Sequence, residues 1–95
     1  MLYLRRVQGN SMLPHFIDGD YIIALKRPLQ RYRTGDVVLA DHPVYHSIIK
    51  RIASIDGSTI WLRGDGTESV STEQMGPINS RQIRGKLLWH IKAPR

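Results

Sequence analysis

The segment of this sequence best suited to nucleophilic chemistry is a short run around Ser11. Gly9 precedes the serine and Pro14 follows it, in the sequence GNSMLP. A glycine lets the backbone approach a ligand closely, and a proline limits how far a helix opened by Ser11 can continue. We therefore expect Ser11 on a sharp, constrained turn, which is a suitable mount for a nucleophile. The same pattern also fits a serine that only caps a turn.

A serine hydroxyl needs a base to become nucleophilic, and Lys50 is the best candidate. Residues two apart on a strand share a face, so Lys50 would project with Ile48 and Ile52 among branched aliphatic side chains. Burial disfavours the ammonium form and can lower a lysine pKa from about 10.4 towards about 7 or 8, where the free amine is a general base. The alternative is that the stem packs while the ammonium reaches water.

The elements that must position these two groups are strands, because β-branched and aromatic residues alternate between frequent turn signals. Glycine next to aspartate predicts tight turns over 18–20, 34–36, 56–58 and 64–66. We expect a mainly β fold, a small antiparallel or mixed β barrel-like domain over residues 1–95 with short helical turns over 11–16 and 71–76. The expected strands cover residues 21–25, 37–40, 47–53, 59–62 and 82–91.

Composition narrows the function classes. A chain of 95 residues that is 41% apolar can bury one core, and the absence of cysteine excludes disulfides, thiolate metal sites and a cysteine nucleophile. The net charge of +6 and pI near 10.2 fit a nucleic acid, an anionic membrane or an acidic protein as partner. No segment approaches the roughly 20 apolar residues of a membrane helix or the core of a signal peptide. We therefore expect a cytoplasmic protein with no transmembrane anchor of its own.

Four blocks of the chain, in this order, resemble the signal peptidase I-like serine/lysine proteases. They are GNSMLP at 9–14, GDVVL at 35–39, KRI at 50–52 and GDG at 64–66, and the resemblance runs from about residue 7 to residue 85. The serine-methionine-x-proline and lysine-arginine elements are specific when they occur together. The resemblance implies the fold of signal peptidases and repressor proteases and a single catalytic domain.

The resemblance also implies roles for individual residues. Ser11 would be the acylating nucleophile and Lys50 the general base, with Ser69 orienting the lysine amine through a hydrogen bond. The Ser11 N–H would donate to the oxyanion on the turn formed with Gly9 and Asn10. Many relatives carry a hydroxyl donor where this chain has Gly9, so the oxyanion hole would rely on main-chain groups.

The expected substrate is a precursor protein with a short N-terminal leader peptide, bound extended against a strand edge. Met12, Pro14, Ile48 and Ile49 are expected to bind it, and no cofactor or metal is expected. Membrane-bound members of the family carry anchors before the serine, and its self-cleaving repressors carry a DNA-binding domain and a scissile bond upstream; this chain shows neither. With GNSMLP at 9–14 and the spacing of the four blocks, the chain looks most like the maturation proteases of nickel-type superoxide dismutase.

Departures from the family pattern keep an inactive relative as an alternative. Gly66 stands where asparagine is usual, residues 71–73 replace an aspartate-serine-arginine run, and His15 replaces a common threonine. These differences fall on supporting positions rather than on Ser11 or Lys50, which favours an active protease.

Two further interpretations come from outside the protease class. The basic charge would suit a small nucleic-acid-binding barrel, but Trp61 and Trp89 lie in apolar strand patterns and are expected in the core or at an edge, so no nucleic acid is expected. His42 and His46 are spaced four apart, but Pro43 breaks the helix that would bring them onto one face, which argues against a metal site.

Overall fold

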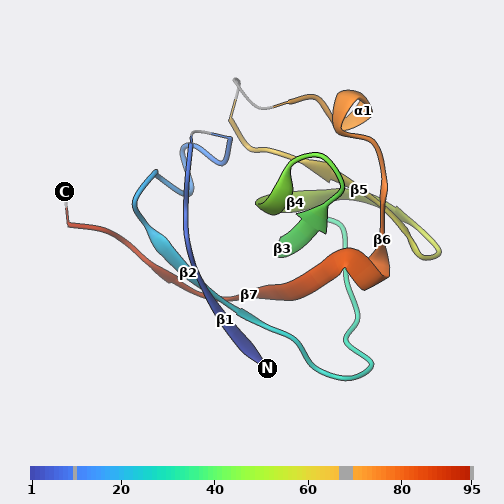
Figure 1. Ribbon diagram of the computed structural model, residues 1–95, viewed down its shortest axis with the longest axis horizontal. Helices are drawn as coiled ribbons and strands as arrows, with labels where there is room; N and C mark the ends of the chain where they lie inside the picture. Colours follow the sequence, from blue (N-terminus) through green and yellow to red (C-terminus); the bar gives the residue numbers. More distant parts are fainter. Residues whose placement is uncertain (10, 67–69, 95) are drawn as a thin grey trace.

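Seven antiparallel strands form one curled sheet in the computed structural model, which describes residues 1–9, 11–66 and 70–94 (Figure 1). The strand order across the sheet is β1-β2-β7-β3-β4-β5-β6, so the last strand returns between β2 and β3. The expected mainly β, barrel-like fold is confirmed. In chain order the elements are β1 (Leu2–Arg6), β2 (Tyr21–Leu25), β3 (Val37–His42), β4 (His46–Asp56), β5 (Thr59–Arg63), α1 (Thr72–Met75), β6 (Ile78–Asn79), the 3-10 turn η1 (Ser80–Gln82) and β7 (Ile83–Ile91).

The five strands expected from the sequence are present, and β4 is longer than expected. The structure adds β1 and the two-residue β6. Residues 11–16 form turns rather than an assigned helix, and the Phe16 N–H donates to the Met12 carbonyl four residues earlier, as in one turn of a helix. The expected turn near residue 71 is the helix α1, which the Ser71 hydroxyl caps by accepting from the Gln74 N–H at 3.1 Å.

The apolar side chains pack into two clusters. The larger cluster joins β3, β4, β5 and β7 and includes Ile52, Leu62 and Ile83. The smaller one contains Met12 and Phe16 from the loop between β1 and β2, together with buried residues of β2 and β3. The loop that carries the serine is therefore part of the core.

A glycine is required by the backbone at the β4–β5 hairpin. Gly57 has a φ of +62°, a conformation that residues with a side chain seldom adopt. The Asp-Gly turn predicted there is confirmed. Among the helices of the described ranges, none is long and apolar enough to cross a membrane.

Candidate active site

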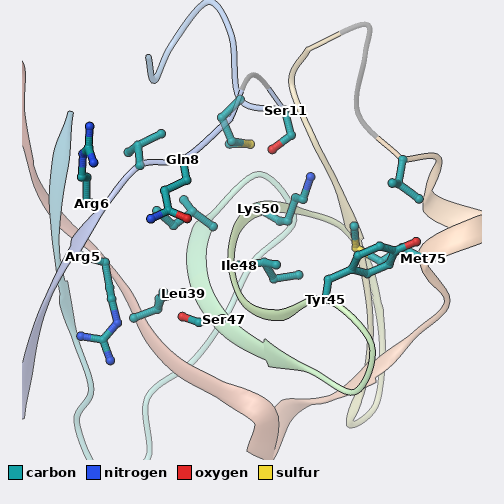
Figure 2. A pocket seen from close by; sticks show the side chains of 14 residues that line it. Arg5, Arg6, Gln8, Ser11, Leu39, Tyr45, Ser47, Ile48, Lys50 and Met75 are labelled. Atoms are coloured by element: carbon teal, nitrogen blue, oxygen red, sulfur yellow. The ribbon is translucent and has the colours of Figure 1, made fainter. Parts of the chain in front are cut away.

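Ser11 and Lys50 line the same cavity, which has a volume of about 230 Å³. Figure 2 shows their side chains pointing toward one another, Ser11 from the loop after β1 and Lys50 from β4. The rest of the wall comes from residues 5–8, from β3 and β4, and from the segment around α1. The fold thus brings together two residues that are far apart in sequence.

The turn that carries Ser11 is fixed on both sides. On one side the Met12 side chain, only 2% exposed, sits in the core, and the Phe16 N–H donates to the Met12 carbonyl at 3.0 Å. On the other side the Ser11 carbonyl accepts from the Gly66 N–H at 2.8 Å, which ties the turn to the loop after β5. The peptide bond before Pro14 is cis.

Gly9 is needed for the shape of this turn. Its φ is +78°, and its N–H donates to the Asp18 carboxylate at 2.8 Å. That bond closes the loop between β1 and β2 near its base. The backbone conformation therefore explains the glycine without any contact to a ligand.

The Lys50 side chain is buried on β4. Its residue exposure is 6%, and it projects between the half-buried Ile48 and the buried Ile52. Burial lowers the pKa of the Lys50 amine below its ordinary value, while the negative charge of Asp65 opposes that shift. Among the described residues the amine donates no hydrogen bond, so it is available to groups that enter the cavity.

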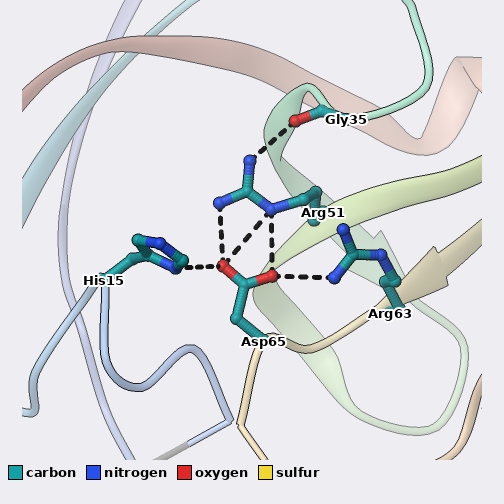
Figure 3. A network of polar contacts seen from close by, with 5 residues as sticks. All are labelled: His15, Gly35, Arg51, Arg63 and Asp65. Atoms are coloured by element: carbon teal, nitrogen blue, oxygen red, sulfur yellow. Dashed lines mark hydrogen bonds and ion pairs between the residues drawn. The ribbon is translucent and has the colours of Figure 1, made fainter.

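Asp65 is the centre of a polar network that joins β4, β5 and the loop carrying Ser11 (Figure 3). Its carboxylate accepts from Arg51 Nη2 at 2.7 Å and from Arg51 Nε at 2.9 Å, and it contacts Arg63 Nη1 at 3.0 Å and His15 Nδ1 at 2.9 Å. The hydrogen bond from Arg51, and secondarily its charge, holds the pKa of Asp65 below the ordinary value in spite of burial. Because Arg51 follows Lys50 and His15 belongs to the Ser11 loop, one carboxylate connects the elements that carry both groups.

The other residues expected at the site fall into three groups. Met12, Ile48 and Ile49 line the cavity with Ser11 and Lys50. Pro14 is exposed and does not belong to the described lining of the cavity. The predictions for Asn10 and Ser69 lie outside the described residues.

Sequence reasoning missed two polar residues that shape the site. Asp65 was interpreted as part of a turn and of the GDG block, and no charge partner was assigned to it; that partner is Arg51, next to Lys50. His42 was weighed as a metal ligand and no structural role was assigned to it; it is buried, and its Nε2 donates to the Met75 carbonyl at 2.7 Å. Its Nδ1 accepts from the N–H groups of Val44 at 3.0 Å and Tyr45 at 3.2 Å, so the backbone occupies both ring nitrogens.

The two tryptophans do not share the environment expected from their apolar strands. Trp61 is half-buried on β5, whereas Trp89 on β7 is 65% exposed. Trp89 therefore lies outside the core. It is on the outward side of β7 opposite Ile23, past Lys86, where the pairing of β7 with β3 ends.

Comparison with known family models gives one match that covers most of the chain. The sequence model described as Peptidase S24-like matches residues 1–88, a range that includes all of the cavity-lining residues and most of β7. The chain belongs to the Peptidase S24-like family. This family comprises serine-protease-type and repressor-type proteins, and its members can be inactive. No curated protein matches this S24-like chain.

The family match corrects the scope of the resemblance drawn from the motifs. It supports the broad class of serine-protease-type domains to which repressor proteases belong. It does not extend to signal peptidase I or to the maturation of superoxide dismutase.

Proposed function

We propose that this S24-like chain is a serine endopeptidase in which Ser11 is the nucleophile and Lys50 the general base. The observation that carries the proposal is the Lys50 amine, buried in the cavity that Ser11 also lines and lowered in pKa by that burial. A lysine can accept a proton near neutral pH only when its ammonium form is disfavoured in this way. An exposed lysine would be protonated and unable to activate a hydroxyl.

The chemistry follows from two proton transfers. The neutral Lys50 amine takes the Ser11 hydroxyl proton as Oγ bonds to the carbonyl carbon of the scissile peptide. The resulting ammonium gives that proton to the departing amine nitrogen, the C–N bond breaks and an ester remains on Ser11. A water then attacks the ester while Lys50 accepts its proton and returns it to Oγ, which releases the acid product and restores both groups.

The main chain of Ser11 is suited to stabilise the negative oxygen formed in the first step. Among the described residues its N–H has no hydrogen-bond partner, although the Ser11 carbonyl is held by Gly66. A donor fixed before charge develops contributes several kcal/mol to transition-state binding, about 2.7–4 where one has been removed by mutation. The proposed supporting role of Ser69, to orient the lysine amine, follows from the family resemblance alone.

The cavity favours an extended peptide with small or apolar groups next to the cut. Met12, Ile48 and Ile49 give its wall an apolar character. We assign Pro14 an indirect part, because it shapes the turn before His15 while lying outside the lining. The proposed substrate is a precursor with a short N-terminal leader, and the precursor of a nickel-type superoxide dismutase is the first to test.

The decisive experiment incubates the purified chain with that precursor and follows release of the leader by mass spectrometry. The Ser11→Ala and Lys50→Ala variants should lose processing, whereas Ser54→Ala and Lys86→Ala should retain it. Ser54 is exposed on β4, and the Lys86 ammonium pairs with Asp36 at 3.4 Å outside the cavity. Equal processing by all five proteins would reject the dyad.

A second measurement separates the dyad from the choice of substrate. A peptide nitrophenyl ester should leave an acyl group on Ser11, detected in the intact mass and absent in Ser11→Ala. Acylation without cleavage of the precursor would keep the dyad and reject the dismutase leader. Failure to acylate would indicate an inactive member of the family.

A further inference from the structure

The outward face of β1, β2 and β7 carries a continuous apolar surface. Leu4 on β1 pairs with Ile23 on β2, and Ile23 pairs in turn with Trp89 on β7. Side chains directly opposite one another across antiparallel strands share a face of the sheet. Tyr21 and Ile91 pair in the same way one row further along. In Figure 1 these three strands lie together, away from α1.

This surface is open to solvent, although the opposite side of β2 belongs to the core. Leu2 is 60% and Leu4 57% exposed, whereas Ile22 and Ala24, which alternate with the outward residues of β2, are completely buried. We call the exposed side chains the outer apolar face. They are Leu2, Leu4, Tyr21, Trp89 and Ile91. Contiguous exposed apolar surfaces of this kind usually mark an interaction site.

Positive charge surrounds the outer apolar face. The sequences of β1, β2 and β7 contain no aspartate or glutamate. Arg6 pairs with Tyr21 in the sheet register, Arg27 follows the end of β2 and Lys92 follows the end of β7. Within the described ranges, none of these three cations belongs to an ion pair. The face therefore combines apolar side chains with uncompensated cations at its border.

We propose that the outer apolar face binds an anionic lipid surface. Trp89, Leu2 and Leu4 enter the boundary between headgroups and acyl chains, where an indole finds an apolar environment for its ring and polar partners for its N–H. Arg6 and Lys92 contact lipid phosphates, since the negative surface of an anionic membrane attracts cations close to it. The binding is peripheral, because the contacting residues lie on one face of a sheet.

Charge complementarity selects lipid over the other occupants. A second copy of this chain also carries a net charge of +6 and would bring the same arginines and lysines against the first copy. A single-stranded nucleic acid needs a cationic groove with stacking platforms. Here the apolar row of Leu4, Ile23 and Trp89 lies between the row that begins at Arg6 and the row that ends at Lys86.

The strand β1 links this surface to the cavity. Its outward residues Leu2 and Leu4 belong to the outer apolar face, and the chain from Arg5 to Gln8 lines the cavity that holds Ser11. Docking through the face therefore keeps the cavity close to the lipid surface. The proposal itself does not depend on peptidase activity, because it rests on exposure and charge alone.

The test is sedimentation of the full chain with vesicles of equal parts phosphatidylglycerol and phosphatidylcholine, against vesicles of phosphatidylcholine alone. We expect binding to the anionic vesicles only, weakened by high salt. Acyl chains brominated near the headgroup should quench the tryptophan fluorescence of the unmodified chain. No sedimentation with the anionic vesicles, or sedimentation without quenching, would overturn the proposal.

A pair of matched variants locates the contact. The double variant Leu4→Ser/Trp89→Ser should bind the anionic vesicles about tenfold more weakly or worse. Leu29→Ser/Val44→Ser should bind unchanged, since Leu29 and Val44 are exposed at 98% and 68% but lie outside the face. Equal loss in both variants rejects the face as the contact. The proposal is also rejected if the unmodified chain binds no vesicles and the first variant converts a dimer into a monomer. It is rejected as well if the unmodified chain binds single-stranded DNA more tightly than vesicles.

Discussion

Replacing Asp65 by asparagine should destabilise the chain strongly, because its carboxylate is shared by three side chains, from β4, β5 and the loop that carries Ser11. The Asp65 side chain is 5% exposed and that of Arg51 is 21% exposed. Breaking a buried ion pair by removing one partner costs about 3–5 kcal/mol. The partial exposure of Arg51, and its remaining hydrogen bond to the Gly35 carbonyl at 2.8 Å, lower that figure to about 2–3 kcal/mol. The contacts from Arg63 and His15 add little, since these side chains are 47% and 61% exposed.

The chain supplies a matched control for this substitution. Asp41 also pairs with an arginine, Arg84, but the two side chains are 42% and 53% exposed. Asp41→Asn should therefore change the free energy of unfolding far less than Asp65→Asn does, because solvent screens an exposed pair. Urea denaturation at neutral pH measures both variants against a total stability of roughly 5–14 kcal/mol for 95 residues.

The pH dependence gives a second check on the same reasoning. The pKa of Asp65 is lowered in the folded chain, chiefly by the hydrogen bond from Arg51, so the carboxylate stabilises the fold above its unfolded pKa of about 3.9. That contribution is lost as the pH falls through the lower, folded pKa. The difference in the free energy of unfolding between the unmodified chain and Asp65→Asn should therefore narrow only at acid pH. Equal losses for the Asp65 and Asp41 variants, or a gap that persists at acid pH, would refute the account.

Three other predictions concern the base and the packing of the sheet. Lys50→Met should abolish peptidase activity without loss of stability, because methionine removes a charge that burial disfavours. The pKa of Lys50 is lowered in the folded chain, so the unmodified chain gains stability as the pH rises between the folded and unfolded pKa values. Urea melts at rising pH should therefore show that the stability advantage of the variant shrinks. The pH profile of kcat/KM should rise through an apparent pKa below 10.5, and Asp65→Asn should lower that pKa further because the Asp65 charge opposes the shift; an unchanged profile in the variant would contradict this. Gly85→Ala should cost about 1–3 kcal/mol in a urea melt, since its Cβ would lie 3.1 Å from Ala24 Cβ and 3.2 Å from the backbone of Leu25, and Ala24→Gly should relieve part of the loss in the double variant.

Local pattern was sufficient to predict most of the sheet. The strands around Ile22, Val38 and Ile60 follow from alternating apolar residues between glycine-aspartate turns, and period two also placed Lys50 on the face of Ile52. β1 was missed because its inward residues include an arginine while its leucines face outward, which is the reverse of the usual alternation. A bulge in the pairing of β2 with β7 likewise sets the direction of Trp89, and composition does not reveal a bulge.

The site was only partly predictable for a related physical reason. The motifs indicated Ser11 and Lys50, and the fold brings both to one cavity. The network around Asp65 joins residues 15, 35, 51 and 63, and such non-local contacts depend on strand order and register rather than on any local signal. The hydrogen bond from His42 to the Met75 carbonyl was not predicted for the same reason, because Met75 belongs to a helix that is distant in the sequence.

The alternation of β1 has a consequence for how such a chain can change over time or by design. Adjacent residues of β1 face different surroundings: Leu4 belongs to the outer apolar face, and Arg5 lines the cavity that contains Ser11. Selection for a new surface preference can therefore act on every second residue while the intervening ones keep the interior unchanged. A library that randomises only positions 2 and 4 should yield chains that differ in the surface they bind but share the same peptidase activity.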